Sequence, residues 1–545
     1  MNRRIRFVLV LMLLIGFLGY RQFARTHEHA ATADAATASQ VAPAIAGDAT
    51  PTAAANAADA ANAPAAITRR LGSIAFTPCT LAPDFGVQTI EAQCGKLEVP
   101  ENRAAPQGRK IALAIAWLPA KGEAAPDPVT MIAGGPGQSA LESFPQIAGA
   151  FTEVRKHRDI VLVDQRGTGG SNRLTCKDAE GKNAAIEKAP ADAAGSTPQD
   201  EVALATAATA RCAAQLASRA DLRFYTTTDA IQDLDAVRAA ISAPQWNLMG
   251  ISYGTRVAQQ YAKRYPARTR TITIDGIAPN SLVLGNDFAK NLESSLDRQF
   301  ARCASDKSCA AKLGNPRSRL DALMAQLRAA PPQVTFRDAI TGVSRTETLT
   351  ADHIAGLARM FAYAPQAAGL LPLELAEAAQ GRYEPLMALA NLLQSTIGDS
   401  ITGGMQLSVI CAEDAGELKS DPADAGSLLG NAINDTLQSQ CAVWPHGGRP
   451  ADFRAPLTGK VPVLILSGEF DPVTPPKYGE EVLKSLPNGR HLVLRGQGHN
   501  VLPVGCVPKL FAQFVDKADA KALDVRCLDK VPYAQPFTGF YGWEP

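Results

Sequence analysis

The sequence has no excess of charge of either sign. Its 545 residues include 54 Lys and Arg against 53 Asp and Glu, which gives a formal net charge of +1. Because proteins that bind nucleic acid normally carry a basic excess or a basic stripe, we expect no nucleic-acid partner. Hydrophobic residues make up 46% of the chain, which suffices for a large buried core and excludes disorder throughout.

Motifs that bind metals or cofactors are also missing. The chain has no Cys-x-x-Cys pair and no His at zinc-finger spacing, which argues against a structural zinc site. It has no H-E-x-x-H motif, no P-loop and no G-x-G-x-x-G after a strand-like segment. We therefore expect neither a metal nor an organic cofactor.

Long apolar runs are scarce, which excludes a transporter with several membrane spans. The one such run, Phe7–Tyr20, follows Arg3, Arg4 and Arg6. Basic residues before an apolar segment of this length are typical of a secretory signal, and the run is shorter than the about 20 residues of a membrane span. We expect an exported protein, periplasmic or secreted, with residues 1–29 either cleaved as a signal peptide or kept as an anchor in the inner membrane.

Residues 30–66 consist mostly of Ala with Thr, Asp, Asn and Pro, and they include no aromatic residue. Such a segment cannot bury enough apolar surface to offset the entropy of an ordered chain. It is therefore predicted to be a flexible linker, and we expect the folded part to begin near residues 67–73.

Ten cysteines support export, because an even number of cysteines in an exported chain indicates disulfides. Pairing each cysteine with its neighbour in the sequence gives five local bridges, the simplest of many connectivities. The cysteines are Cys79, Cys94, Cys176, Cys212, Cys303, Cys309, Cys411, Cys441, Cys506 and Cys527.

Strand-like apolar runs alternate with helical patterns, and a long helical stretch interrupts them. Residues 279–445 are rich in Ala and Leu, with one β-like segment around Val334–Leu349. This order predicts an α/β fold, a doubly wound and mostly parallel sheet in two parts (67–278 and 446–545) with a helical lid (279–445) inserted between them. Predicted strands are Lys110–Leu118, Val129–Ala133, Asp159–Val163, Trp246–Met249, Thr271–Ile274, Val461–Ser467 and His491–Leu494; predicted helices are Thr228–Ile241, with a Thr cap, and Ser252–Arg264.

The segment Gly250-Ile251-Ser252-Tyr253-Gly254 lies between a predicted strand and a predicted helix. This is the nucleophile-elbow pattern, in which small residues allow a sharp turn and leave the serine exposed at a helix N-terminus. The helix dipole and the amide of Tyr253 would then face an oxyanion. Ser252 is the candidate nucleophile, and a plain Gly-rich turn is the alternative.

A second glycine cluster, Gly134-Gly135-Pro136-Gly137, directly follows a predicted strand. An early loop of this kind supplies the second oxyanion donor in enzymes with a nucleophile elbow. We assign that donor to the amide of Gly135, with Gly134 as the next choice and an ordinary loop as the alternative.

A serine nucleophile needs a general base, and the base needs a carboxylate that orients it. Of seven histidines, His499 follows the last predicted strand, where the chain order Ser, acid, His places the base. The acid should follow the preceding strand, and Asp471 does so, with Glu469 as its competitor. The histidines set aside by position are His27, His29, His157, His353, His446 and His491.

Five motifs occur in order over about 370 residues: GGPGQS, DQRGTGGS, GISYGT, GEFDPVTP and GQGH. Together they resemble the proline iminopeptidase / tripeptidyl aminopeptidase family of α/β-hydrolase serine peptidases, in its larger secreted branch. The resemblance runs from about residue 75 to the C-terminus and implies the triad Ser252, Asp471 and His499. One departure is Ala133, where the iminopeptidases usually have His; tripeptidyl-type members commonly lack it, so proline-only specificity is in doubt.

The resemblance also implies roles for three acidic or basic residues. Asp164 and Arg166 of the DQRGTGGS motif would brace the oxyanion region, a buried structural ion pair being the alternative. A substrate's cationic amino terminus calls for a carboxylate, and Glu413, in Cys411-Ala412-Glu413-Asp414, best matches the family's acidic site. The alternative is that these acidic residues are merely solvated.

We therefore expect a monomeric, exported serine aminopeptidase that acts on peptides near their free N-terminus, of tripeptidyl or prolyl type, through an acyl-enzyme. Two alternatives stay open. The first is a carboxylesterase or lipase of the same fold, since the acyl chemistry is shared. The second is a binding module without catalysis, although such modules usually lose a triad member.

Overall fold

The computed structural model describes residues 68–83, 88–176, 198–397, 401–539 and 542. The predicted signal peptide or anchor (1–29) and the predicted linker (30–66) lie outside the described residues. Within the described ranges, no helix has both the length and the apolar character that crossing a membrane requires.

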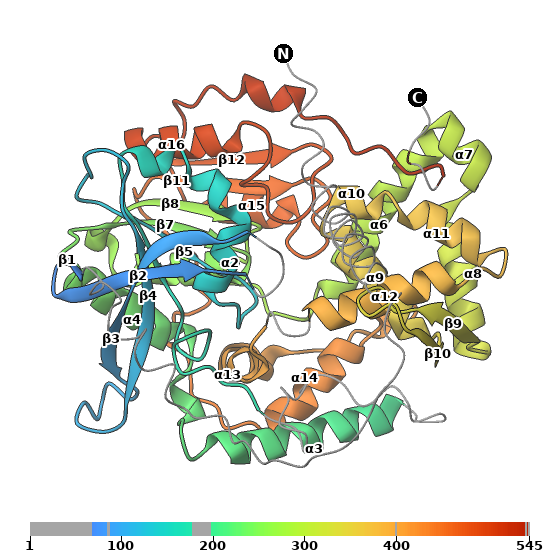
Figure 1. The fold of residues 1–545 in the computed structure, drawn as a ribbon, viewed down its shortest axis with the longest axis horizontal. Coiled ribbons are helices and arrows are strands. Elements are labelled where there is room, and N and C mark those ends of the chain that lie inside the picture. Colours follow the sequence, from blue (N-terminus) through green and yellow to red (C-terminus); the bar gives the residue numbers. More distant parts are fainter. Residues whose placement is uncertain (1–67, 84–87, 177–197, 398–400, 540–541, 543–545) are drawn as a thin grey trace, which may run out of the picture. The chain divides into compact units, whose positions relative to one another are not determined.

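Ten strands form one large sheet in the described part of the chain (Figure 1). The strands from β1 to β4 are antiparallel, and β6 is antiparallel to β4; from β6 to β12 all neighbours are parallel. The predicted fold, a mostly parallel α/β-hydrolase sheet with a large helical insertion, is confirmed. In spatial order the strands are β1 (Arg69–Leu71), β2 (Ile74–Leu81), β3 (Ile90–Pro100), β4 (Lys110–Leu118), β6 (Ile160–Val163), β5 (Val129–Ile132), β7 (Trp246–Ile251), β8 (Thr269–Asp275), β11 (Val463–Gly468) and β12 (Gly489–Leu494).

The parallel strands form where the sequence is continuously apolar. All six residues of β11 are buried, because a parallel strand inside an α/β fold is covered on both faces. Val463 and Ile465 face one core cluster, whereas Leu464 and Leu466 face the other. Each of the seven predicted strands is confirmed to within two residues at either end. The strands β1, β2 and β3 were not predicted.

Helices cover both faces of the sheet. The residues of each strand alternate between two hydrophobic clusters, one on either face, and each cluster is completed by helices. The helices on one face include α4 (Thr227–Ala240), α5 (Tyr253–Arg264) and α15 (Pro476–Leu483), and those on the other include α2 (Ala140–Ile147) and α16 (Val507–Lys517).

The helix α4 begins one residue before the predicted range, and its cap is Thr226. The Thr226 side chain accepts a hydrogen bond from the amide of Asp229 at 3.3 Å, and the Asp229 carboxylate accepts one from the Thr226 amide at 3.2 Å. This reciprocal capping box satisfies two donors at the helix start. It explains why the first of three consecutive threonines, rather than a later one, ends the preceding loop.

Between β8 and β11 the chain forms the helical insertion, residues 276–462. Leu292, Leu323 and Leu386 belong to a hydrophobic core of its own, whereas Met405 and Val409 belong to the core beside the sheet. The predicted β segment is the hairpin of β9 (Gln333–Arg337) and β10 (Ser344–Thr348). The helices are α6 (Phe288–Ser305), α7 (Lys307–Leu313), α8 (Pro316–Ala329), α9 (Ala351–Ala362), α10 (Pro365–Ala368), α11 (Leu371–Ala378), α12 (Glu384–Ile397), α13 (Gly403–Glu413) and α14 (Ala432–Val443).

A further helix, α3 (Pro198–Leu216), was not predicted and lies beside α14 (Figure 1). The side-chain amide of Gln440 on α14 donates to the hydroxyl of Thr209 on α3 at 3.0 Å. Because α3 precedes β7 in the chain, it does not belong to the insertion. A segment from before the insertion thus packs beside one of the insertion's helices.

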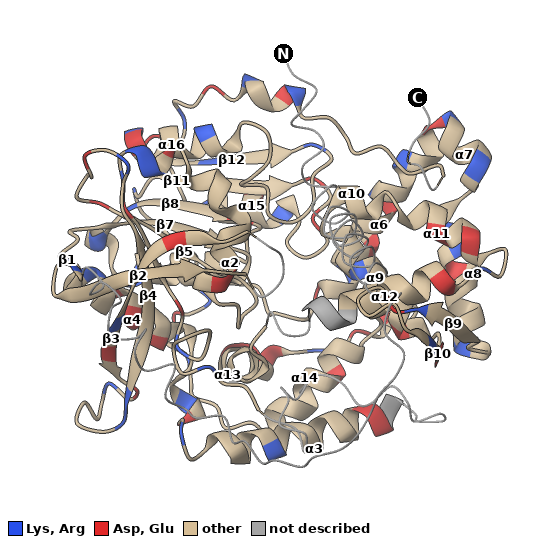
Figure 2. Ribbon diagram, viewed as in Figure 1, with Lys and Arg blue, Asp and Glu red and all other residues tan. Residues whose placement is uncertain are grey.

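Charged residues of both signs are spread over the elements (Figure 2). Many of them pair, as Arg317 does with Asp297 at 2.8 Å and Arg158 with Asp127 at 2.9 Å. This pattern agrees with the balanced composition of the chain.

All ten cysteines form disulfides, and the nearest-neighbour pairing is confirmed. The two cysteines of each bridge are close in the sequence, and the largest separation is 36 residues. The pairs are Cys79–Cys94, Cys176–Cys212, Cys303–Cys309, Cys411–Cys441 and Cys506–Cys527.

Candidate active site

Ser252 lies at the sharp turn between β7 and α5. Its φ of 54° falls in the left-handed region that non-glycine residues rarely adopt, as expected for a nucleophile elbow. A side chain at Gly250 or Gly254 could not fit, because a Cβ atom there would lie 2.5 Å from the carbonyl oxygen of Gly254 or 2.2 Å from that of Ile132. The glycines of the motif are therefore required by the close approach of strand and helix.

The glycine loop after β5 lies directly against Ser252. A Cβ atom on Gly134 would come within 3.0 Å of the Cβ atom of Ser252. Gly135 has a φ of 99°, which favours glycine, and its amide has no hydrogen-bond acceptor among the described residues. The amide of Tyr253, at the first position of α5, has no acceptor within its own helix.

His499 and Asp471 form a buried pair after the last two strands. His499 Nδ1 lies 2.7 Å from Asp471 Oδ2. Burial lowers the pKa of His499, but the carboxylates of Asp471 and Asp275 together raise it more, so the net pKa lies above its ordinary value. Burial raises the pKa of Asp471, but His499 and two backbone amides lower it more, so this carboxyl is ionised. This is the arrangement that fixes an imidazole tautomer and stabilises its cation.

Thr474 is a member of this site that the sequence did not reveal. Its hydroxyl donates to Asp471 Oδ2 at 2.9 Å and lies 3.2 Å from His499 Nδ1. Its amide donates to Asp471 Oδ1 at 2.7 Å. The acid loop, residues 469–474, thus folds around the carboxylate. The signal was present in the turn sequence GEFDPVT, because Asp side chains commonly accept hydrogen bonds from amides two or three residues later.

Glu469, the competing carboxylate, has other partners. Its Oε2 accepts hydrogen bonds from the amide of Gly496 at 2.7 Å and from the hydroxyl of Tyr533 at 3.1 Å. Glu469 therefore connects the acid loop to the loop that carries His499, while Asp471 contacts the imidazole.

The loop after β8 connects Ser252 with His499. The amide of Ser252 donates to the backbone oxygen of Asp275 at 2.9 Å. Gly276, with a φ of 67°, packs so closely on His499 that a Cβ atom would lie 2.7 Å from Cε1 of the imidazole. The structure thus brings Ser252, Asp471 and His499 to the carboxyl ends of the parallel strands β7, β11 and β12, the end of the sheet where α/β folds carry their sites.

The helical insertion contacts both the loop that carries His499 and the loop that carries Asp471. The carbonyl oxygen of Tyr363, just after α9, accepts a hydrogen bond from the amide of His499 at 2.9 Å. The Tyr363 ring also lies edge to face with the imidazole, with 5.2 Å between ring centroids. The insertion therefore forms one wall around the histidine.

One face of α6 holds the acid loop. Asn291 donates to the carbonyl oxygen of Val473 at 2.9 Å, and Ser295 donates to that of Phe470 at 2.6 Å. Arg298 donates to the carbonyl oxygen of Glu469 at 2.9 Å. The spacing i, i+4, i+7 places the three side chains on one helix face. We call these residues, Asn291, Ser295 and Arg298, the α6 face.

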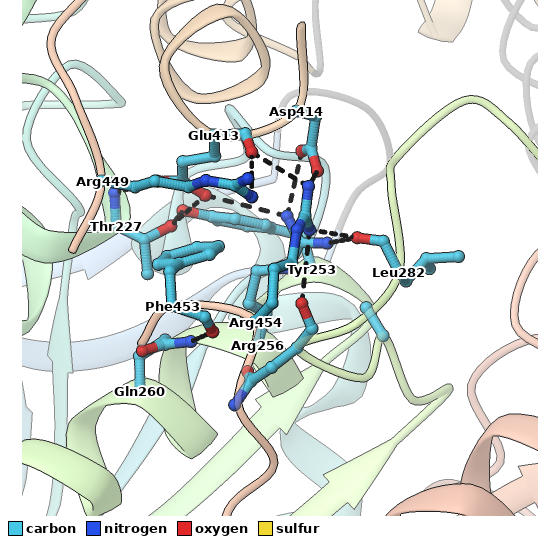
Figure 3. Close-up of polar contacts among 12 residues, drawn as sticks. Thr227, Tyr253, Arg256, Gln260, Leu282, Glu413, Asp414, Arg449, Phe453 and Arg454 are labelled. Carbon is cyan, nitrogen blue, oxygen red and sulfur yellow. Dashed lines mark hydrogen bonds and ion pairs between the residues drawn. The ribbon is translucent and has the colours of Figure 1, made fainter. Parts of the chain in front are cut away.

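Glu413, the candidate for amine binding, lies in a buried cluster (Figure 3). Its carboxylate accepts hydrogen bonds from the amide and the hydroxyl of Thr227 at 2.7 and 3.0 Å and lies 3.7 Å from Arg256. Asp414 pairs with Arg256 at 3.0 Å and with Arg454 at 2.8 Å. Burial raises the pKa of Glu413 to about 7. The alternative of merely solvated acidic residues is wrong, because Glu413 and Asp414 are 2% and 1% exposed.

This cluster reaches the nucleophile turn through Tyr253. The hydroxyl groups of Thr227 and Tyr253 lie 2.6 Å apart, and Tyr253 follows Ser252 in the chain. Glu413 on α13, Thr227 on α4 and Tyr253 on α5 are thus linked by consecutive hydrogen bonds.

Asp164 and Arg166 do not pair with each other. Asp164 accepts hydrogen bonds from the hydroxyl of Ser139 at 2.6 Å and from the amide of Leu141 at 3.1 Å, which anchors the start of α2. Arg166, fully buried, pairs with Asp233 on α4 through two nitrogens at 2.6 and 2.7 Å. Arg166 thus forms a buried ion pair, but with a partner that its own motif does not contain.

The sheet order, the strained serine turn and the His–Asp pair define an α/β-hydrolase architecture. The family model of the alpha/beta hydrolase fold matches residues 127–505, and the chain belongs to this family. It is 25% identical over 464 residues to the serine protease Hip1 of Mycobacterium tuberculosis, covering 79% of this chain and 85% of that protein. It is 28% identical over 190 residues to a tripeptidyl aminopeptidase of Streptomyces lividans, covering 34% and 35% of the two chains.

A third relative, carboxylesterase B of M. tuberculosis, is 25% identical over 427 residues, which cover 72% of this chain and 78% of that protein. The resemblance seen in the five motifs is confirmed. The protein is a serine hydrolase of the peptidase type.

Proposed function

We propose that the protein is an exported serine aminopeptidase with the catalytic triad Ser252, His499 and Asp471. The observation that carries the proposal is the buried pair of His499 Nδ1 and Asp471 Oδ2, 2.7 Å apart. Ser252 is held next to this pair's strands, because its amide donates to the backbone oxygen of Asp275 at the end of β8. Similarity to a serine protease over most of the chain supports the peptidase reaction. Five disulfides and the same similarity support export.

In the proposed reaction, Ser252 attacks the scissile carbonyl carbon and His499 accepts its proton at Nε2. The amides of Tyr253 and Gly135 hold the oxyanion. His499 then protonates the leaving amine, and a water molecule, deprotonated by His499, hydrolyses the acyl-enzyme. The Asp471 carboxylate stabilises the imidazolium in both steps.

A fluorophosphonate probe tests the nucleophile. It should label the unmodified protein at Ser252, and Ser252→Ala should abolish both labelling and hydrolysis while the protein keeps its thermal midpoint. A folded protein that the probe does not label would refute the proposal. It is the result that the binding-module alternative requires.

Glu413 is our candidate for binding the substrate's amino terminus, and the helical insertion (the predicted lid) would close the pocket around it. A carboxylate in a dry site forms a strong charge-assisted pair with an ammonium group. Its contacts with Thr227 also anchor the start of α4, so the two roles must be separated by experiment.

Glu413→Gln should lower kcat/KM for free-amine tripeptidyl anilides about tenfold or more and leave a nitrophenyl ester almost unaffected. Glu153→Gln is the matched control, because this carboxylate is 37% exposed and pairs with Lys156 outside the Glu413 cluster. N-acetylated peptides should be poor substrates of the unmodified enzyme. Equal losses on ester and peptide, or equal cleavage of acetylated and free peptides, would contradict amine recognition.

An esterase is the second candidate, favoured by the similarity to carboxylesterase B. The acyl step is common to both reactions. Comparing alanyl-, prolyl- and tripeptidyl-anilides with nitrophenyl esters decides between them: turnover of esters alone would overturn the peptidase proposal.

A further inference from the structure

Asp275, the last residue of β8, is a buried carboxylate that the reaction above does not use. It is fully buried. Its Oδ1 accepts a hydrogen bond from the amide of Val501 at 3.0 Å, and its Oδ2 accepts one from the amide of Leu502 at 2.7 Å. Both amides belong to the loop that carries His499.

The same residue also contacts the nucleophile turn. The backbone oxygen of Asp275 accepts the hydrogen bond from the amide of Ser252 at 2.9 Å, and the next residue, Gly276, packs on the imidazole of His499. One residue of the central strand therefore holds the serine turn through its main chain and the histidine loop through its side chain.

We propose that Asp275 is a positioning residue that sets the geometry between Ser252 and His499 and supplies a second negative charge to the imidazolium. The inference rests on the proposed triad and deepens it. Because a misplacement of about 1 Å between reacting groups lowers rates by about 100-fold, a shared support for both groups has a direct effect on rate.

The electrostatic surroundings support the second role. The titratable or charged groups around His499 are Asp471, Asp275 and the Tyr363 phenol, behind which lies Arg359. Asp275 acts to raise the pKa of His499. Burial raises the pKa of Asp275 itself to about 6, so at pH 7 to 8 the carboxyl is mostly ionised and can stabilise a cation.

The test measures the rate of fluorophosphonate labelling between pH 4.5 and 9 for the unmodified protein, Asp275→Asn and Asp275→Ala. Both substitutions remove the charge. We expect the plateau rate to fall about tenfold or more and the acidic midpoint to move to lower pH by about one unit, because the His499 pKa loses one stabilising anion. An effect on folding alone would lower the rate without moving the midpoint.

Asp127→Asn is the matched control. This buried carboxylate accepts hydrogen bonds from Arg158 at 2.9 Å and Asn247 at 2.8 Å, but it precedes β5 and so lies at the opposite end of the sheet from the site. It should lower stability and keep the midpoint. An unchanged midpoint in a folded Asp275 variant overturns the inference alone, whereas an unmodified protein that the probe cannot label at Ser252 overturns the proposed function.

Amide hydrogen exchange keeps the inference testable if neither Asp275 variant folds. In the unmodified protein, the peptide containing Val501 and Leu502 should be protected at pH 8 and should lose protection below pH 6, after correction for intrinsic exchange, because a protonated carboxyl is a weaker acceptor. Equal protection of this peptide at both pH values would overturn the inference.

Discussion

Replacing Glu413 by Gln should change how stability depends on pH. Burial raises the pKa of Glu413 from an ordinary value of 4.5 to about 7 in the folded protein. A raised pKa means that the folded state binds the proton more tightly, so this contribution to stability is complete below pH 4.5 and is lost as the pH rises through 7. A shift of this size corresponds to about 3 kcal/mol.

Gln cannot ionise, and its side-chain oxygen can still accept the hydrogen bond from the Thr227 amide, which is 2.7 Å long in the unmodified protein. Relative to the unmodified protein, the free energy of unfolding of Glu413→Gln should therefore increase by about 2–3 kcal/mol between pH 5 and pH 8. Urea unfolding at both pH values, with the disulfides intact, measures this difference.

Asp127→Asn is the control for this experiment, because Asp127 is a buried carboxylate outside the Glu413 cluster that accepts hydrogen bonds from Arg158 at 2.9 Å and Asn247 at 2.8 Å. The loss of these contacts should lower stability by a similar amount at both pH values. If the difference between Glu413→Gln and the unmodified protein is the same at pH 5 and pH 8, the carboxyl does not titrate as its burial requires, and the reasoning is refuted.

Three further outcomes follow from the contacts. Asp233→Ala removes the carboxylate nearest to the buried guanidinium of Arg166 and leaves only Asp229, at 4.0 Å; it should lower the free energy of unfolding by about 3–5 kcal/mol in urea titrations. Ser295→Ala removes a hydrogen bond to the acid loop and should slow fluorophosphonate labelling about fivefold, whereas Ser305→Ala, exposed on the same helix, should not. Because the pKa of His499 lies above 6.5 and only the neutral imidazole accepts a proton, the labelling rate of the unmodified protein should be half-maximal above pH 6.5; a midpoint near pH 5 would contradict the assignment.

The parallel strands were predictable because their burial on both faces leaves an unbroken apolar run, as in Val463–Gly468. The strands β1, β2 and β3 were missed for the opposite reason. In Ile74–Leu81 buried and exposed residues alternate only in part, and the strand contains Pro78 and Cys79. Such antiparallel strands are defined by their partners rather than by their composition.

In the site, the positions of Ser252, Asp471 and His499 after β7, β11 and β12 could be read from the sequence, because the elbow motif and the order Ser, acid, His are local features. Their catalytic role stays a prediction. The contacts of Asp275 could not be read from the sequence, since only the folded chain makes them, whereas the turn sequence GEFDPVT carried a local signal for those of Thr474. The distance along the chain between Asp275 and Leu502 is 227 residues. No local pattern reports such a contact, and an aspartate at a strand end is otherwise unremarkable.

The α6 face connects the helical insertion with the acid loop, which follows strand β11 of the sheet. It holds three carbonyl oxygens of the acid loop, so outward movement of α6 would draw Asp471 away from the imidazole. The position of Asp471 beside His499 therefore depends on the packing of a helix that belongs to the insertion and not to the sheet core. A chimera that exchanges helical insertions between relatives should therefore transfer α6 together with residues 469–474, so that these three contacts are kept.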